Sequence, residues 1–428
     1  MSKIPKIKEV TSREILDSRG APTIETAVLL SDGTRASASV PSGTSVGSHE
    51  ALELRDNDRT RFFGQGVLKA VTNAQEKIGP RITGIEVTRQ KEIDSAMVNL
   101  DGTENKASLG ANAILSVSLA VARAAAQSLG KSLYAYLNEL FSDISHLKLE
   151  TSRLPVPLFN LINGGKHGCG SLDFQEFLLA PAVFMTFKER IEAGVEIYQG
   201  LKKTLEEKGF LTSVGLEGGF TPTVKNEEAL DLIVKALNQS RYKLDKDVFL
   251  GLDLAATHFQ TEGYYNLSGQ KSLSTDELIN LLCQLNEKYH FLLLEDPFAE
   301  DDWQGWQKLN EKLGQKTLIA GDDLLTTNLK RLKMAVTQEA CSTVVVKPNQ
   351  IGTLNETLQF VKVAKEANLR IVIAHRSGET NDAFVADLAV AVGADFVKFG
   401  APSRGERVAK YNRLLAIEDE LGKNQKCV

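Results

Sequence analysis

One short stretch indicates the fold, Val344-Val345-Val346-Lys347-Pro348-Asn349-Gln350. Three β-branched apolar residues run into a lysine, and a Pro-Asn turn follows at once. A short apolar run bounded by turn residues is typical of a fully buried strand in a parallel sheet. Lys347 then stands at the carboxyl end of that strand, where α/β sheets and barrels place their chemistry. A buried lysine can serve as a base, although a single lysine also fits a surface or ion-paired residue.

Five further apolar runs each end in an ionisable residue. With Lys347, the six positions are 253, 295, 322, 347, 375 and 398, and after a first interval of 42 residues the spacings are 27, 25, 28 and 23. Each spacing accommodates one strand, one helix and two short loops. The pattern predicts six successive βα units of a β/α barrel with one polar cluster at its carboxyl-end mouth.

Residues 1–141 follow a different pattern, which predicts a separate α+β domain. Strands are expected at 24–30 and 35–40, joined by a turn that contains Asp32-Gly33. Helical patterns lie at about 66–79, 88–100 and 108–129, and a short helix runs to about residue 141. The loop at 41–50 is rich in small residues and fits a mobile lid over a ligand, or simply a flexible surface loop.

The second domain is expected over residues 142–428. Two strands, at about 154–161 and 174–179, precede two helices, at about 186–208 and 226–239, and the regular βα units follow. The predicted fold class is α/β, a modified β/α barrel (two strands, two helices, then six βα units) with an N-terminal α+β capping domain.

Composition limits the classes of function. Hydrophobic residues make up 42% of the 428 residues and charged residues 25%, which is ordinary for a globular protein with a large core. The net charge of −5 argues against a general nucleic-acid surface. Four cysteines lie far apart without a C-x-x-C pair, which favours a reducing compartment. No stretch approaches 18 apolar residues, so we expect no membrane span and a cytoplasmic location.

The polar cluster predicts a metal site. Asp253, Glu295 and Asp322 end neighbouring strands, and three crowded carboxylates repel one another unless a cation compensates them. All-oxygen ligation suits Mg²⁺. Separate salt bridges to the local lysines are the alternative.

The cations beside this cluster suit a substrate that carries both phosphate and carboxylate. Arg376 can clamp an oxyanion with two hydrogen bonds, and Ser377 can add a donor. A metal, a lysine and an acid together are what proton abstraction next to a carboxylate requires. Glu217 or Glu176 could supply a proton to a departing hydroxyl on the opposite face.

At these positions the chain resembles the enolase family from end to end. The motifs that carry the resemblance are Leu16-Asp17-Ser18-Arg19-Gly20, Val40-Pro41-Ser42-Gly43, Asn163-Gly164-Gly165, Gln175-Glu176-Phe177, Glu217-Gly218-Gly219, Glu295-Asp296-Pro297-Phe298, Gly321-Asp322-Asp323-Leu324, Asn349-Gln350-Ile351-Gly352, His375-Arg376-Ser377-Gly378-Glu379-Thr380 and Gly400-Ala401-Pro402. The resemblance implies reversible, Mg²⁺-dependent dehydration of 2-phosphoglycerate to phosphoenolpyruvate. It also implies a cytoplasmic, glycolytic enzyme that forms homodimers or higher homo-oligomers.

The resemblance also implies a role for each matching residue. It implies that Lys347 is the base that removes the C2 proton, and that Glu217 with Glu176 is the acid that expels the C3 hydroxyl. It implies two Mg²⁺ ions in each site, the first bound by Asp253, Glu295 and Asp322 and the second by Ser45. The implied substrate-binding residues are His167, His375, Arg376, Ser377 and Lys398.

Several residues depart from the family's usual pattern. Leu216 stands where an aspartate precedes the acid, Thr44 and Val46 stand in the lid, Pro348 follows the base, Phe399 follows Lys398, and Ala416 replaces an arginine that pairs across the dimer with the acid matching Glu25. These departures keep two alternatives open. One is an enolase-family paralogue that acts on a related phosphonate or phospho-acid, and the other is a non-catalytic binding protein on the same fold.

Overall fold

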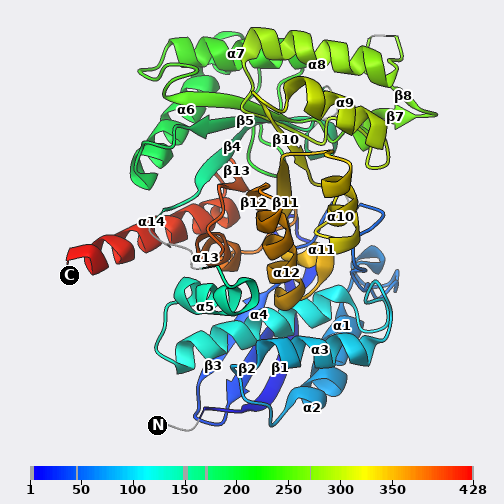
Figure 1. Ribbon diagram of the computed structural model, residues 1–428, viewed down its shortest axis with the longest axis vertical. Coiled ribbons are helices and arrows are strands. Elements are labelled where there is room, and N and C mark those ends of the chain that lie inside the picture. Colours follow the sequence, from blue (N-terminus) through cyan, green and yellow to red (C-terminus); the bar gives the residue numbers. More distant parts are fainter. Residues whose placement is uncertain (1–3, 45–46, 148–152, 169–171, 270, 427–428) are drawn as a thin grey trace.

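The computed structural model describes residues 4–44, 47–147, 153–168, 172–269 and 271–426 (Figure 1). A small N-terminal sheet with its helices lies at one end of the molecule, and a closed barrel surrounded by helices forms the rest. The predicted fold class is confirmed. The division into 1–141 and 142–428 stays a prediction, although the helix expected to end at about residue 141 runs on to Ser145.

The N-terminal part is an antiparallel three-stranded sheet covered by helices. The burial of β2 alternates along most of its length, as expected of a strand with one face on a core. Helix α4 packs on β2 and β3 and is buried on nearly every side. The prediction of one helix at 66–79 is wrong in detail. The observed helical segment runs from residue 68 to residue 82, and a π-helical turn interrupts it. The elements are β1 (Ile7–Leu16), β2 (Pro22–Leu30), β3 (Arg35–Ser39), η1 (Phe62–Gly64), α1 (Leu68–Thr72), η2 (Asn73–Ile78), α2 (Gly79–Ile82), α3 (Gln90–Asp101), α4 (Ala111–Ser128) and α5 (Leu133–Ser145).

Eight strands close into a barrel in the order β10-β11-β12-β13-β4-β5-β6-β9. All neighbours are parallel except β5, which runs antiparallel to both β4 and β6. The described residues of the β4–β5 connection, 164–168 and 172–175, contain no α-helix, and without a long crossover the second strand must return in the opposite direction. The strands are β4 (Val156–Asn163), β5 (Glu176–Pro181), β6 (Val248–Asp253), β9 (Leu293–Glu295), β10 (Leu318–Gly321), β11 (Thr343–Val346), β12 (Arg370–Ala374) and β13 (Phe396–Gly400).

Several helices of the barrel begin at a residue whose side chain caps the helix. Thr186 opens α6 and Ser274 opens α8, each with a capping box completed by the glutamate three residues later. The helical elements are η3 (Gly165–His167), α6 (Phe187–Glu207), α7 (Asn226–Asn238), η4 (Ala256–Phe259), α8 (Thr275–Tyr289), α9 (Trp303–Leu313), α10 (Leu329–Thr337), α11 (Pro348–Ile351), α12 (Leu354–Glu366), α13 (Phe384–Ala391) and α14 (Gly405–Lys426), and β7 (Gln260–Thr261) pairs with β8 (Tyr264–Tyr265).

The interior of the barrel is apolar below its mouth. Side chains such as Leu178, Val345 and Val372 form a compact cluster that separates the mouth from the other end. The polar residues at the strand ends therefore meet above a sealed floor.

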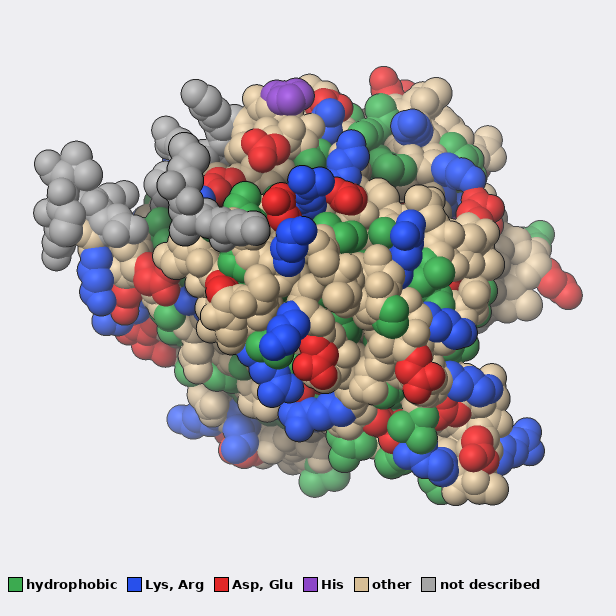
Figure 2. All heavy atoms as spheres, turned by 90° about the horizontal axis from the view of Figure 1, so that it is seen from below, with side chains coloured by type: hydrophobic (Ala, Val, Ile, Leu, Met, Phe, Trp, Pro, Cys, Tyr) green, Lys and Arg blue, Asp and Glu red, His purple; other side chains and the backbone are tan. Residues whose placement is uncertain are grey.

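The surface carries mixed charge. On the face shown in Figure 2, basic and acidic side chains lie interspersed, with apolar side chains between them. Of the described helices, none is by itself long and apolar enough to cross a membrane. Helices α4 and α5 reach that threshold only as a pair, and they meet at 109°.

Candidate active site at the barrel mouth

The strand ends enclose a small cavity. The empty space between its lining side chains is about 430 Å³, including the part that opens to solvent. Eleven predicted site residues lie in the described part of the chain, and ten of them line this cavity. The exception is Glu295, which pairs with the lining residue Lys398. The lining residues are His167, Gln175, Glu176, Glu217, Asp253, Ala255, Asp296, Asp322, Asp323, Lys347, His375, Arg376, Ser377 and Lys398.

One part of the mouth, here called the lysine side, comprises Asp253, Glu295, Asp322, Lys347 and Lys398. Asp253 and Glu295 are register partners on β6 and β9, and both carboxylates converge on Lys398 Nζ, at 3.1 Å and 2.6 Å. Lys347 Nζ, at the end of β11, forms an ion pair with Asp322 Oδ2. All five residues are buried or nearly so, so these charges interact with little solvent screening.

The lysine side has more negative charge than its own cations compensate. Burial raises the pKa of Asp253, and burial together with the neighbouring carboxylates raises that of Glu295 well above its usual range despite Lys398. Glu295 Oε2 is buried and has no hydrogen-bond partner among the residues that the structure describes. An unpaired carboxylate oxygen among further carboxylates fits a hard divalent cation with oxygen ligands.

Asp296 is a residue of this region to which the sequence reading gave no role. Its two oxygens accept hydrogen bonds from the backbone N–H groups of Asp322 (2.9 Å) and Asp323 (2.7 Å), and its φ of +42° lies in the left-handed region. The oxygens of these three aspartates come within 4.8 Å of one another. Because backbone donors already occupy both Asp296 oxygens, we assign Asp296 to holding Asp322 in place.

The other part of the mouth, here called the imidazole side, comprises His167, Glu176, Glu217 and His375. The antiparallel direction of β5 puts Glu176, its first residue, opposite Asp253 and therefore at the mouth. His167 Nδ1 lies 3.1 Å from Glu176 Oε1 and 3.5 Å from Glu217 Oε1. His375 Nε2 lies 3.2 Å from Glu217 Oε2.

Positive charge from neighbouring side chains compensates the two carboxyl groups of the imidazole side. Burial alone would raise the pKa of Glu217, but the positive charge of His167 lowers it to about 2. Burial alone would lower the pKa of His167, but the charges of Glu217 and Glu176 raise it. Glu176 also pairs with Lys398, whose Nζ lies 3.2 Å from Glu176 Oε2. Each of the two carboxyl groups therefore lies against a basic side chain.

Arg376 and Ser377 lie between the barrel and the loop at 41–50. Arg376 donates to both oxygens of Glu50, at 2.8 Å and 3.1 Å, so a buried carboxylate already occupies the predicted oxyanion clamp. Ser377 Oγ accepts from the backbone N–H of Thr44 (2.9 Å) and lies 2.8 Å from the Thr44 hydroxyl. Ser45, the predicted ligand of a second ion, lies outside the described residues, and the predicted mobility of the loop stays a prediction.

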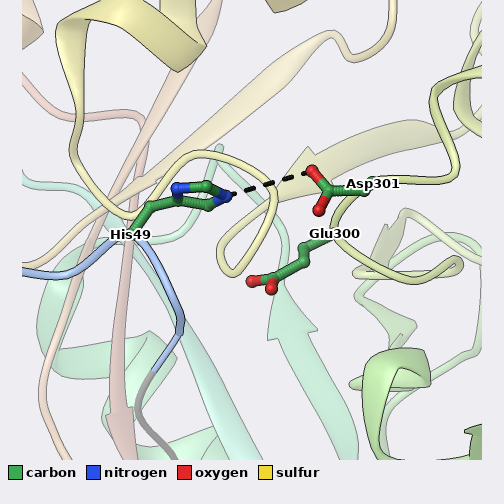
Figure 3. Close-up of side chains that lie close together, drawn as sticks. All are labelled: His49, Glu300 and Asp301. Atoms are coloured by element: carbon green, nitrogen blue, oxygen red, sulfur yellow. Dashed lines mark ion pairs between the residues drawn. The ribbon is translucent and has the colours of Figure 1, made fainter.

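A third group of possible ligands lies at the rim, where His49 faces Glu300 and Asp301 (Figure 3). Arg331 Nη1 lies 2.8 Å from His49 Nε2 and 3.0 Å from Asp301 Oδ1. A guanidinium therefore engages the imidazole lone pair that a metal would need. This group ties the 41–50 loop to the barrel and is not a second metal centre.

Comparison with family models decides the family. The description "Enolase, N-terminal domain" matches residues 7–137, and "Enolase, C-terminal TIM barrel domain" matches residues 151–427. The chain belongs to the enolase family. The two matches cover the small sheet and the barrel, so the motif-based resemblance extends over both parts of this enolase fold.

The departures from the usual enolase pattern differ in how close they lie to the cavity. Leu216 is half-buried, and its backbone meets the site at two points: its N–H donates to the carbonyl of His167 (3.1 Å) and its carbonyl accepts from Arg407 (3.0 Å). Phe399 does not reshape the cavity as its size suggested, because its ring turns away from the mouth and packs 6.0 Å from that of Tyr411. Pro348 is the first residue of α11, where a missing N–H costs no hydrogen bond. Ala416 is exposed on α14.

Proposed function

We propose that this chain catalyses the Mg²⁺-dependent, reversible dehydration of 2-phosphoglycerate to phosphoenolpyruvate. The observation that carries the proposal is that one cavity is lined by a nearly buried lysine, Lys347, and by the carboxyl groups of Glu176 and Glu217. Removing a proton from C2 and a hydroxyl from C3 requires a base and an acid on opposite sides of the substrate.

On the lysine side, Lys347 removes the C2 proton. Its ammonium now pairs with Asp322, and this charge raises the pKa of Lys347 although burial opposes it. Asp253, Glu295 and Asp322 would hold Mg²⁺, which when bound stabilises negative charge on the carboxylate oxygens of the substrate. Lys398 orients Asp253 and Glu295 through two of its three ion pairs, and the third joins it to Glu176 at 3.2 Å.

On the imidazole side, Glu217 with Glu176 gives its proton to the hydroxyl that leaves C3. His167 and His375 hold Glu217 from two directions and keep water from competing for its oxygens. Arg376 and Ser377 bind the phosphate, which has to replace Glu50 on the guanidinium. A second Mg²⁺ at Ser45, a cytoplasmic location, a glycolytic role and a homodimer or higher homo-oligomer belong to the same proposal.

Leu216 supports one alternative, an enolase-family paralogue for a related phosphonate or phospho-acid. It removes a carboxylate next to Glu217 while the rest of the imidazole side is kept. The packing of Phe399 away from the mouth removes another reason for that alternative.

The test follows the absorbance of phosphoenolpyruvate from 2-phosphoglycerate, with Mg²⁺ and again with EDTA. We expect turnover that EDTA abolishes, that is lost in Lys347→Ala, and that is kept in the control Lys308→Ala, an exposed lysine on α9. Magnesium binding without turnover would overturn dehydration of this substrate and favour the paralogue. Absence of both would favour a non-catalytic binding protein.

A further inference from the structure

Arg407 is a buried arginine whose guanidinium lies directly beneath the imidazole side. It comes from α14, at the end of the chain, and is 0% exposed. Nη1 donates to His375 Nδ1 (2.8 Å) and to the carbonyl of Arg376 (2.6 Å). Nη2 donates to the carbonyls of Leu216 (3.0 Å) and Ser377 (2.6 Å).

These contacts determine which nitrogen of His375 carries the proton. A guanidinium can only donate, so Nδ1 must present its lone pair to Arg407. A neutral imidazole carries one N–H, which is then on Nε2, the nitrogen that faces Glu217 Oε2 at 3.2 Å. Burial and the charge of Arg407 lower the pKa of His375 well below its usual value, so the ring stays neutral.

The tautomer of the ring matters for Glu217, the proposed acid. With Nε2 protonated, His375 can only donate toward Glu217. With Nε2 unprotonated, the imidazole would offer a lone pair to a protonated Glu217, and it could take away the proton that the leaving hydroxyl needs.

We propose that Arg407 is a positioning residue that fixes His375 as the Nε2–H tautomer, so that this ring cannot accept the proton that Glu217 delivers. The delivery of that proton rests on the proposed dehydration. In the step concerned, the C3–O bond breaks, a proton passes from Glu217 to the departing oxygen, and water leaves. His375 neither gains nor loses a proton.

The packing around Arg407 supports a fixed geometry. Gly400 has a φ of +87°, and a Cβ there would lie 2.7 Å from the Glu217 carbonyl and 3.0 Å from both Arg407 Cδ and His375 Cε1. A lysine at position 407 would keep the charge, but its single nitrogen cannot reach four acceptors that two nitrogens now serve.

The first measurement is ¹⁵N NMR of the histidine rings in the full-length, substrate-free chain. The chain has six histidines, and loss of one signal in His375→Gln assigns His375. We expect a neutral Nε2–H ring. An Nδ1–H ring or a doubly protonated ring in the unmodified protein would overturn the proposal, whether or not any Arg407 variant folds.

The second measurement compares Arg407→Lys with Arg404→Lys. Arg404 also donates to a carbonyl of this loop, that of Gly215 at 3.3 Å, but does not contact His375. In Arg407→Lys we expect His375 to lose its single tautomer and dehydration to slow by at least about 10-fold, with exchange of the C2 proton nearly unchanged. Arg404→Lys should change neither. An unchanged tautomer, or an equal loss of dehydration and exchange, would overturn the proposal.

The proposed dehydration and the positioning of His375 by Arg407 can fail separately. Wild-type protein that shows the Nε2–H ring but no dehydration would overturn the proposed function and leave the positioning of His375 by Arg407 standing.

Discussion

The lysine side and the imidazole side of the mouth differ in how their buried carboxyl groups are compensated. On the lysine side, two ammonium groups face Asp253, Glu295 and Asp322, and one oxygen of Glu295 has no partner among the described residues. On the imidazole side, both oxygens of Glu217 face imidazoles, and its pKa falls to about 2. The first arrangement leaves one carboxylate oxygen for a further cation, whereas in the second the imidazoles of the protein itself face both oxygens of Glu217.

The largest effect is expected on Mg²⁺ affinity, when the negative charge of Glu295 is removed. Glu295→Gln keeps the size of the side chain but removes the carboxylate with the unpaired oxygen. We expect Mg²⁺ affinity, measured by calorimetry, to fall at least about 100-fold, since even residues that only support ligands contribute 10- to 100-fold. Glu300→Gln at the rim is the matched control. Equal Mg²⁺ binding in Glu295→Gln and wild type would remove the distinction between the two sides.

Arg376 should affect substrate binding more than the chemical step. Arg376→Lys keeps the charge and loses the planar pair of donors, so we expect KM for 2-phosphoglycerate to rise about 10- to 30-fold with a smaller change in kcat. Arg370→Lys, at an exposed ion pair with Asp395, is the control. A loss confined to kcat would place Arg376 in the chemical step.

In metal-free protein, neutralising a carboxylate should change the free energy of unfolding in opposite directions on the two sides. Glu295→Gln should stabilise the fold by about 1–2 kcal/mol, because it relieves uncompensated buried charge. Glu217→Gln should destabilise it by roughly 2–3 kcal/mol at pH 7, because the pKa of Glu217 is depressed in the folded state.

The sign of the pH dependence follows from that depression. The contribution of Glu217 is fully present above the unfolded pKa of 4.5 and is lost as pH falls toward the folded value of about 2. Urea unfolding in EDTA, repeated at pH 7 and pH 4, checks both variants. Shifts of the same sign at pH 7 would contradict the comparison.

Leu216 should have the smallest effect. Leu216→Asp restores the residue usual in the family, but the backbone carbonyl that Arg407 binds is unchanged. We expect kcat/KM to change by less than about 5-fold, because a half-exposed charge is screened by solvent. A gain of 100-fold would show that this departure, and not the conserved geometry, limits activity on 2-phosphoglycerate.

The sequence predicted the strand ends that face the mouth because each apolar run stops at one ionisable residue. Asp253, Asp322 and Lys347 could be placed from that pattern alone. The direction of β5 could not, because both directions give the same apolar run. The residues alone therefore offered Glu176 only as an alternative to Glu217, and the family resemblance placed the two together.

Other features depend on packing that no local pattern encodes. Nothing in the sequence around Arg407 marks it as a partner of His375, 32 residues earlier. Lys398 and Phe399 are successive residues of β13, so the two-residue period of a strand points their side chains to opposite faces of the sheet. The sequence could therefore have predicted that Phe399 lies outside the cavity.

The division between the two sides is tested most directly by exchange of the C2 proton of 2-phosphoglycerate in D₂O with Mg²⁺, followed by proton NMR. Glu217→Gln should still exchange that proton while forming little phosphoenolpyruvate, because Lys347 acts before the hydroxyl leaves. Lys347→Ala should neither exchange nor dehydrate. Exchange that survives in Lys347→Ala but disappears in Glu217→Gln would contradict the assignment of base and acid to these two sides.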